Sequence, residues 1–351
     1  MRSFVLRRCG VSALSVLLAL CVAPGDGHGF SFSLPWPDTA VTGDETGRRV
    51  TFPSHSPFSL ADVGGDAERD PPTAASGTLF MPSGASASAP VPAVVLLHGA
   101  AGVLDVREVT YARQFAARGV AALVIDVFAP RRERATGFIN RLLNITEAMF
   151  LADAWAGLRY LAAVPGIDGR RVALIGFSYG GMVTTYAAYA QVAETYARNG
   201  EKFAGHVAFY APCIAEFEDD RATGAPLLML YGGRDAIVDP ARCARVAREL
   251  EAGGGRVETV VYRNAVHQWD GWFGGERSIG RSIAGCHFIV EPDGTVRDRQ
   301  ILLPMSSPLL RKVMLGLCAD KEGYLIGRDD GIRARSNGEI SRFLSRIFAM
   351  R

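Results

Sequence analysis

Residues 172–181 read Val-Ala-Leu-Ile-Gly-Phe-Ser-Tyr-Gly-Gly, an apolar run that enters a Gly-x-Ser-x-Gly turn and then a helix-like stretch. This order predicts a strand that turns sharply into a helix, with Ser178 strained at the turn and its hydroxyl lifted above the sheet. Glycines are expected beside the serine because a side chain there would collide with the neighbouring helix or strand. The chain has 39 glycines in 351 residues, so the bare pattern arises by chance roughly a quarter of the time. The surrounding sequence therefore decides its meaning.

The rest of the chain alternates apolar, strand-like runs with amphipathic, helix-like runs. Continuous apolar strands separated by helices are typical of a mainly parallel sheet covered on both faces, which places the fold in the α/β class. A final helix is expected from the capping-box pattern Ser336-x-x-Glu339. Strands are predicted over 93–97, 120–127, 172–176, 206–210, 226–231 and 257–262, and helices over 106–118, around 151–162, from 179 to about 198, and over 240–252.

Two further polar residues follow predicted strands in an order that suits nucleophilic catalysis. Asp235 comes after strand 226–231, and His267 comes after strand 257–262. A serine hydroxyl needs an imidazole to accept its proton, and the imidazole needs a buried carboxylate to fix its tautomer. Ser178, Asp235 and His267 are therefore the predicted nucleophile, acid and base, in the chain order Ser, Asp, His.

Other assignments remain open at this site. Asp239 is an alternative acid, although Asp239-Pro240 fits a helix N-cap and first helical residue better. The oxyanion needs N–H donors, and the amide of Tyr179 directly after the nucleophile is one candidate. A second is expected from the loop 98–102, His-Gly-Ala-Ala-Gly, which follows strand 93–97.

The N-terminus predicts export. Residues 1–25 combine three arginines, an apolar stretch over 11–23 and small residues near position 23, as in a secretory signal peptide. A lipoprotein signal ending at Cys21 and an uncleaved anchor are the alternatives. Once residues 1–25 are removed, no stable membrane span is expected, which implies a periplasmic or secreted protein. Residues 26–74 would form a leader and the first strand region, and 75–351 the main domain, with an insertion or lid at about 271–335.

Charge and cysteine content narrow the class further. The net charge is +2, and without the three signal arginines it becomes 2 − 3 = −1, so no basic footprint for nucleic acid remains. Four cysteines follow the signal, and an even number in an exported chain suggests two disulfides. Their order favours Cys213 with Cys243 and Cys286 with Cys318, against the alternative of four buried thiols. No metal-ligand spacing occurs, and no cofactor is implied.

Six stretches of the sequence are informative when taken together: 94–99, 126–131, 176–181, 208–213, 232–235 and 266–270. Their motifs resemble those of the dienelactone hydrolase family. The resemblance implies an α/β-hydrolase fold with a mainly parallel eight-stranded sheet, and the amides of Ala100 and Tyr179 as oxyanion donors. The founding enzymes have a cysteine nucleophile and an acidic residue in the first loop, where this chain has Ser178 and Gly99.

These observations predict an exported serine hydrolase that cleaves carboxylic ester or lactone bonds of a small molecule through an acyl-serine. A peptidase of the same fold and a catalytically silent binding scaffold are the alternatives. Arg131 or Arg132 could meet an anionic substrate group, or be ordinary surface arginines. The sequence does not identify the substrate or the oligomeric state.

Overall fold

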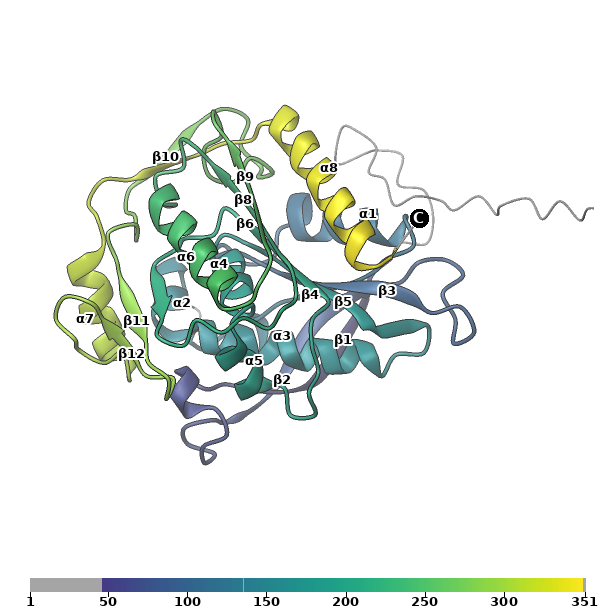
Figure 1. Ribbon diagram of the computed structural model, residues 1–351, viewed down its shortest axis with the longest axis horizontal. Coiled ribbons are helices and arrows are strands. Elements are labelled where there is room, and N and C mark those ends of the chain that lie inside the picture. Colours follow the sequence, from purple (N-terminus) through teal and green to yellow (C-terminus); the bar gives the residue numbers. More distant parts are fainter. Residues whose placement is uncertain (1–45, 135, 350–351) are drawn as a thin grey trace, which may run out of the picture.

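The computed structural model describes residues 46–134 and 136–349 (Figure 1). The predicted signal peptide and Cys21 lie outside these residues, as does the leader up to residue 45. Within the described ranges, no helix is both long and apolar enough to cross a membrane.

An eight-stranded sheet forms the centre of the molecule, in the order β1-β2-β4-β3-β5-β6-β8-β9. The six strands from β4 to β9 in this order are parallel, whereas β2 is antiparallel to both of its neighbours. The predicted α/β-hydrolase fold with a mainly parallel eight-stranded sheet is confirmed. The strands are β1 (Arg48–His55), β2 (Pro72–Phe80), β3 (Val91–Leu97), β4 (Ala121–Ile125), β5 (Ile167–Phe177), β6 (Gly205–Phe209), β8 (Leu227–Gly232) and β9 (Val257–Tyr262).

Strand burial follows from composition. Apart from Val91 at its start, β3 is entirely buried, and β4 and β8 are buried throughout, as expected for apolar strands covered on both faces. The outer strands β1 and β9 alternate with charged or polar residues and are partly exposed. Pro53 is tolerated in β1 because an edge strand has a free side.

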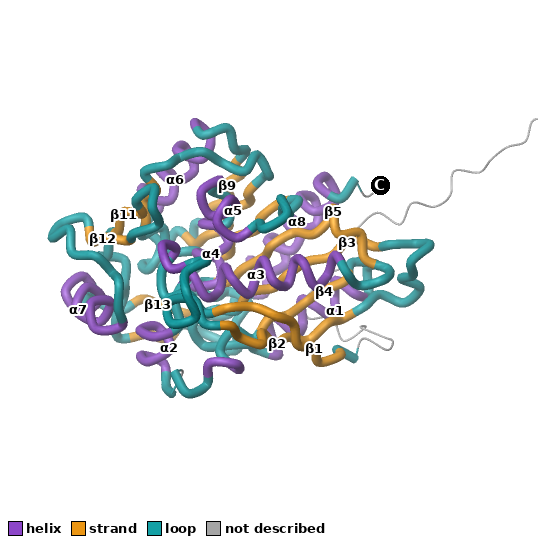
Figure 2. The backbone as a smooth tube through the Cα atoms, turned by 90° about the horizontal axis from the view of Figure 1, so that it is seen from below, coloured by secondary structure: helices purple, strands orange, loops and turns teal. Residues whose placement is uncertain are grey.

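Helices cover both faces of the sheet. Helices α1 (Thr110–Ala116) and α8 (Asp330–Ile347) lie on one face, and α3 (Glu147–Ala162) and α5 (Ala190–Tyr196) on the other (Figures 1 and 2). Helix α4 (Tyr179–Tyr186) packs on β5 and β6, and α6 (Pro240–Ala252) packs on β9. The sheet and its helices bring the carboxyl ends of the parallel strands to one edge.

Two predicted helices are interrupted. The one expected over 106–118 begins as a π-helical turn, Asp105–Val109, before α1. The one expected from 179 to about 198 divides into α4 and α5. At the break, the Ala190 amide donates to the Arg221 carbonyl and the Ala188 carbonyl accepts from the Thr223 amide. These two hydrogen bonds to the loop that contains Arg221 and Thr223 take the place of hydrogen bonds within a continuous helix.

The start predicted for the last helix is wrong. Helix α8 begins seven residues earlier, with Asp329 in place of Ser336 as N-cap, and the Asp329 side chain accepts from the Ile332 amide. Ser336 lies inside the helix, is fully buried, and accepts a hydrogen bond from the Trp269 indole at 3.2 Å. The capping-box pattern at Ser336 therefore does not start a helix, and its serine instead makes a contact in the core.

Residues 271–335, here called the lobe, project at one end of the molecule (Figures 1 and 2). Strand β11 (Phe288–Val290) pairs in parallel with β7 (Ala215–Phe217), which lies in the connection after β6, so the lobe is anchored to the main domain. The lobe contains β10 (Arg277–Ile279), β11 (Phe288–Val290), β12 (Val296–Asp298), α7 (Pro308–Cys318) and β13 (Tyr324–Ile326).

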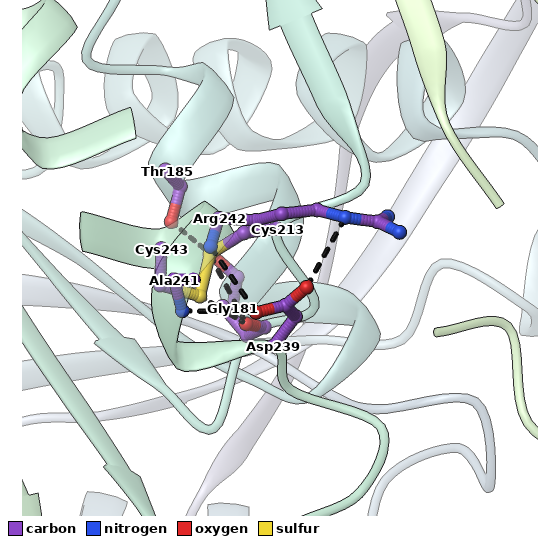
Figure 3. Close-up of a disulfide and its surroundings, with 8 residues drawn as sticks. Gly181, Thr185, Cys213, Asp239, Ala241, Arg242 and Cys243 are labelled. Carbon is purple, nitrogen blue, oxygen red and sulfur yellow. Dashed lines mark hydrogen bonds and ion pairs between the residues drawn. A yellow bond between two sulfur atoms is a disulfide. The ribbon is translucent and has the colours of Figure 1, made fainter. Parts of the chain in front are cut away.

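Both predicted disulfides are present. Cys286 and Cys318 join two parts of the lobe, and Cys213 and Cys243 join the connection after β6 to α6. Figure 3 shows the disulfide between Cys213 and Cys243 beside the start of α6. There Asp239 caps the helix by accepting from the amides of the second and third residues after it, at 2.9 and 3.2 Å. This confirms the capping interpretation of Asp239.

Candidate active site

The turn between β5 and α4 has the conformation that its sequence predicts. Ser178 has φ 54° and ψ −111°, a backbone conformation that costs energy for a residue with a side chain. A Cβ on Gly180 would lie 2.5 Å from the Leu97 carbonyl oxygen, and one on Gly181 would lie 2.6 Å from that of Phe209. Only glycine allows this helix to start so close to the neighbouring strands, and the start holds Ser178 above the sheet.

The structure brings Ser178, His267 and Asp235 together. Nε2 of His267 lies 2.9 Å from Oγ of Ser178, and Nδ1 lies 2.7 Å from Oδ2 of Asp235. All three side chains are buried, and each follows the carboxyl end of a parallel strand: β5, β8 and β9. Serine, imidazole and carboxylate thus form one hydrogen-bonded chain, the geometry needed to pass a proton from the hydroxyl to the imidazole.

The lobe holds His267 in place. The His267 amide donates to the Leu325 carbonyl at 3.0 Å, and its carbonyl accepts from the Gly327 amide at 3.0 Å. The imidazole lies between two aromatic rings that meet it edge-on, Tyr210 at 4.8 Å and Tyr324 at 5.2 Å between centroids. No local pattern in the sequence predicts that these residues belong to the site. Nothing local marks Leu325, which is 58 positions away in the chain.

A buried charged network lies behind the imidazole. The Tyr210 hydroxyl donates to Oδ1 of Asp270 at 2.6 Å, and Nη1 of Arg107 lies 3.4 Å from the same hydroxyl. Arg107 also donates to Glu108 at 2.8 Å, and both side chains are fully buried. Burial raises the pKa of Tyr210 well above its usual value, so its hydroxyl stays protonated as a donor. The network fixes Tyr210 against His267.

The loop predicted to supply the oxyanion donor adjoins the nucleophile. A Cβ on Gly99 would lie 3.3 Å from Cβ of Ser178, so a larger side chain at this position would crowd the nucleophile by a few tenths of an ångström. His98 shapes the loop: its Nδ1 donates to the Gly99 carbonyl at 2.8 Å, and its Nε2 accepts from the Val127 amide at 3.2 Å. Burial lowers the pKa of His98 to about 4, which keeps it neutral in this role.

The two amides proposed as oxyanion donors lie beside this loop and the turn. Tyr179 is the first residue of α4, where a backbone N–H has no acceptor within the helix. Ala100 follows Gly99 in a short turn closed by the Gly102 amide and the Gly99 carbonyl at 3.0 Å. Their assignment as donors remains a prediction.

Arg131 is not available to a substrate. It is buried, and its guanidinium donates to both carboxylate oxygens of Asp153, at 2.7 and 3.0 Å, and to the His55 carbonyl. The suggestion that Arg131 meets an anionic substrate is therefore wrong, because its donors hold the start of the sheet to α3. Arg132 is exposed and lines a shallow hollow with Ala101 and Gly102. In the described part of the chain, no cluster of His, Cys, Asp or Glu could hold a metal ion.

A mainly parallel eight-stranded sheet with a strained serine turn, and with histidine and aspartate at the same edge, defines an α/β-hydrolase. Residues 76–271 match the dienelactone hydrolase family, and the chain belongs to that family. It is a hydrolase of ester bonds, with the esterase or lactonase chemistry of the family.

Individual relatives are distant. A Bradyrhizobium protein named "Probable 2-oxo-3-(5-oxofuran-2-ylidene)propanoate lactonase" is 26% identical over 204 residues, 55% of this chain and 78% of that protein. A dienelactone hydrolase-like promiscuous phosphotriesterase from metagenomic libraries has 20% identity and a TM-score of 0.50, covering 85% of this chain and 98% of that one. Esterase 2 of Thermogutta terrifontis has 19% identity and a TM-score of 0.45, covering 56% and 80%.

Proposed function

We propose that this protein is an exported serine hydrolase that cleaves carboxylic esters or lactones through an acyl-Ser178 intermediate. The observation that carries the proposal is the continuous hydrogen-bonded chain from Ser178 through His267 to Asp235. A buried carboxylate on Nδ1 keeps the proton there and leaves Nε2 free to accept the serine proton. The strained turn presents the hydroxyl to that nitrogen.

The reaction would run in two halves. Oγ of Ser178 bonds to the substrate carbonyl carbon while its proton passes to Nε2 of His267. The carbonyl oxygen gains negative charge, which the amides of Tyr179 and Ala100 would stabilise. The carbon–oxygen bond to the leaving group then breaks, and that oxygen takes the proton from Nε2. Water repeats the sequence on the acyl-serine, giving the acid and restoring the serine; a lactone yields one hydroxy acid instead of two products.

Labelling with a fluorophosphonate tests the nucleophile, because the reagent forms a stable bond with an activated serine. The wild-type chain is expected to be labelled, and Ser178→Ala, with an unchanged circular dichroism spectrum, is not. A folded wild-type protein that takes no label would refute the serine mechanism and favour the silent scaffold. Turnover of aryl esters and lactones, with none of unblocked peptides, would separate an esterase from a peptidase.

Export is supported by the two disulfides, which form and persist in oxidising compartments, and by the sequence pattern of residues 1–25. Mass spectrometry of the protein recovered outside the cytoplasm is expected to show an N-terminus close to residue 25. An intact Met1, or a lipid on Cys21, would contradict a cleaved soluble product.

A further inference from the structure

An apolar cavity of about 90 Å³ lies between the main domain and the lobe. Its lining includes Tyr179, the residue that follows Ser178 in the chain, but not Ser178, Asp235 or His267 themselves. One wall belongs to the main domain and the other to the lobe. Its lining is dominated by aliphatic and aromatic groups, among them Leu142, Leu151, Phe217, Phe288, Val296 and Leu315.

Among the described residues that line the cavity, two have charged side chains, and these neutralise each other. Arg311 donates to both carboxylate oxygens of Glu147, at 2.8 and 2.9 Å, and both groups come from opposite walls, α7 and α3. Burial opposes the ionised form of Glu147, but Arg311 outweighs it and lowers the pKa of that carboxyl. The pair is therefore fully charged and has no net charge.

The remaining donors of Arg311 are also engaged. Its Nε donates to the Leu142 carbonyl at 2.8 Å, and its Nη2 lies 3.3 Å from the Tyr179 hydroxyl. A substrate carboxylate entering this cavity would have to displace Glu147 from Arg311 and would leave a buried carboxylate unpaired, which is strongly unfavourable. An uncharged apolar group would only exchange water for apolar surface.

We infer that the cavity binds an apolar, uncharged part of the substrate during the reaction proposed above, on which this inference rests. The substrates that suit the site are neutral esters or lactones with an alkyl or aryl substituent. The lobe then has a defined role in recognition, because its helix α7 supplies both the apolar wall and the arginine that neutralises Glu147.

The first test uses two neutral series with the purified mature protein: aryl esters with acyl chains of two to eight carbons, and alkyl acetates with alcohols of the same lengths. In the series whose variable chain enters the cavity, either the acyl or the alcohol series, kcat/KM is expected to rise about fourfold per methylene until the cavity is full. A terminal carboxylate on the best substrate is expected to lower kcat/KM about 100-fold or more. Flat profiles in both series, or equal turnover of the carboxylate substrate, would overturn the inference.

The second test uses two leucines on the same helix. Leu315 lines the cavity, whereas Leu317 is 70% exposed. Leu315→Ala is expected to lower kcat/KM about tenfold for the best long-chain ester, whereas Leu317→Ala is expected to leave it unchanged. Leu315→Val should change in the same direction by a smaller factor, and serves if the alanine variant does not fold. Equal behaviour of the two alanine variants would count against the cavity.

The outcomes separate this inference from the proposed function. Absence of fluorophosphonate labelling would refute the serine mechanism itself. Normal labelling and acetate turnover, combined with no dependence on chain length, charge or Leu315, would leave the mechanism standing and refute only the cavity's role.

Discussion

Replacing Tyr210 by phenylalanine removes one oxygen from the network behind the active site. That hydroxyl lies 2.6 Å from Oδ1 of Asp270, which is fully buried. The other carboxylate oxygen of Asp270 has no hydrogen-bond partner among the described residues. The substitution therefore leaves the buried carboxyl group of Asp270 without this donor, and losing a hydrogen bond to a charged group costs about 1.5–3 kcal/mol. We expect Tyr210→Phe to lower the free energy of unfolding by that amount.

Tyr189→Phe is the matched control. Tyr189 is as buried as Tyr210, but its hydroxyl has no partner among the described residues. Removing that hydroxyl is expected to be neutral or slightly stabilising, because an unsatisfied polar group leaves the core. The comparison isolates the hydrogen bond from the general effect of a tyrosine-to-phenylalanine change.

Urea unfolding followed by tryptophan fluorescence at neutral pH, with the disulfides intact, measures both variants. The Phe ring keeps its edge-on position against His267, so folded Tyr210→Phe should retain esterase turnover within a fewfold of wild type. If both variants lose the same stability, or Tyr210→Phe loses less than about 1 kcal/mol, the hydrogen bond from the Tyr210 hydroxyl to Asp270 does not stabilise the fold, and the role given to this network is refuted.

Three further results are expected. Burial lowers the pKa of His206 to about 4 in the folded protein, from about 6.5 in the unfolded chain. Between pH 6.5 and pH 4 only the unfolded chain takes up the proton, so acidification lowers the free energy of unfolding by up to about 3 kcal/mol. The urea midpoint of His206→Leu should therefore fall less over this pH range than that of the wild type. Replacing Cys286 and Cys318 by alanine opens a loop of 32 residues, which should cost about 4 kcal/mol by the chain-entropy model; an unchanged denaturant midpoint would contradict this. Asp235→Asn should lower kcat about 10⁴-fold, because it favours the wrong imidazole tautomer of His267. Asp239→Asn should leave kcat unchanged, because asparagine still caps α6. Equal losses of kcat in the two variants would contradict the assignment of Asp235 as the catalytic acid.

The features that the sequence predicted well are those with a local signal. The strand before Ser178 is a continuous apolar run, and close contacts require the glycines of the turn that follows it. Asp235 and His267 each come shortly after an apolar strand. In a parallel sheet the carboxyl ends of the strands share one edge, so chain order alone was enough to bring these residues together. The cysteine pairing likewise followed from order and an even count.

The features that the sequence did not reveal depend on contacts between distant segments. Arg107 and Glu108 look like surface residues of an amphipathic helix, but tertiary packing buries both as an ion pair. Ser336 has the pattern of a helix cap, and packing against Trp269 places it inside α8. Arg131 reads as a candidate anion ligand until Asp153, 22 residues away, occupies it.

The backbone bonds from His267 to residues 325 and 327 have a consequence for engineering. The same segment of chain that walls the apolar cavity also sets the position of the catalytic base. Replacing the lobe with a different segment would change these two bonds to His267, so selection for a new substrate would act on turnover and on recognition together. Mutant libraries that vary α7 and leave residues 324–327 unchanged would alter substrate specificity without moving His267.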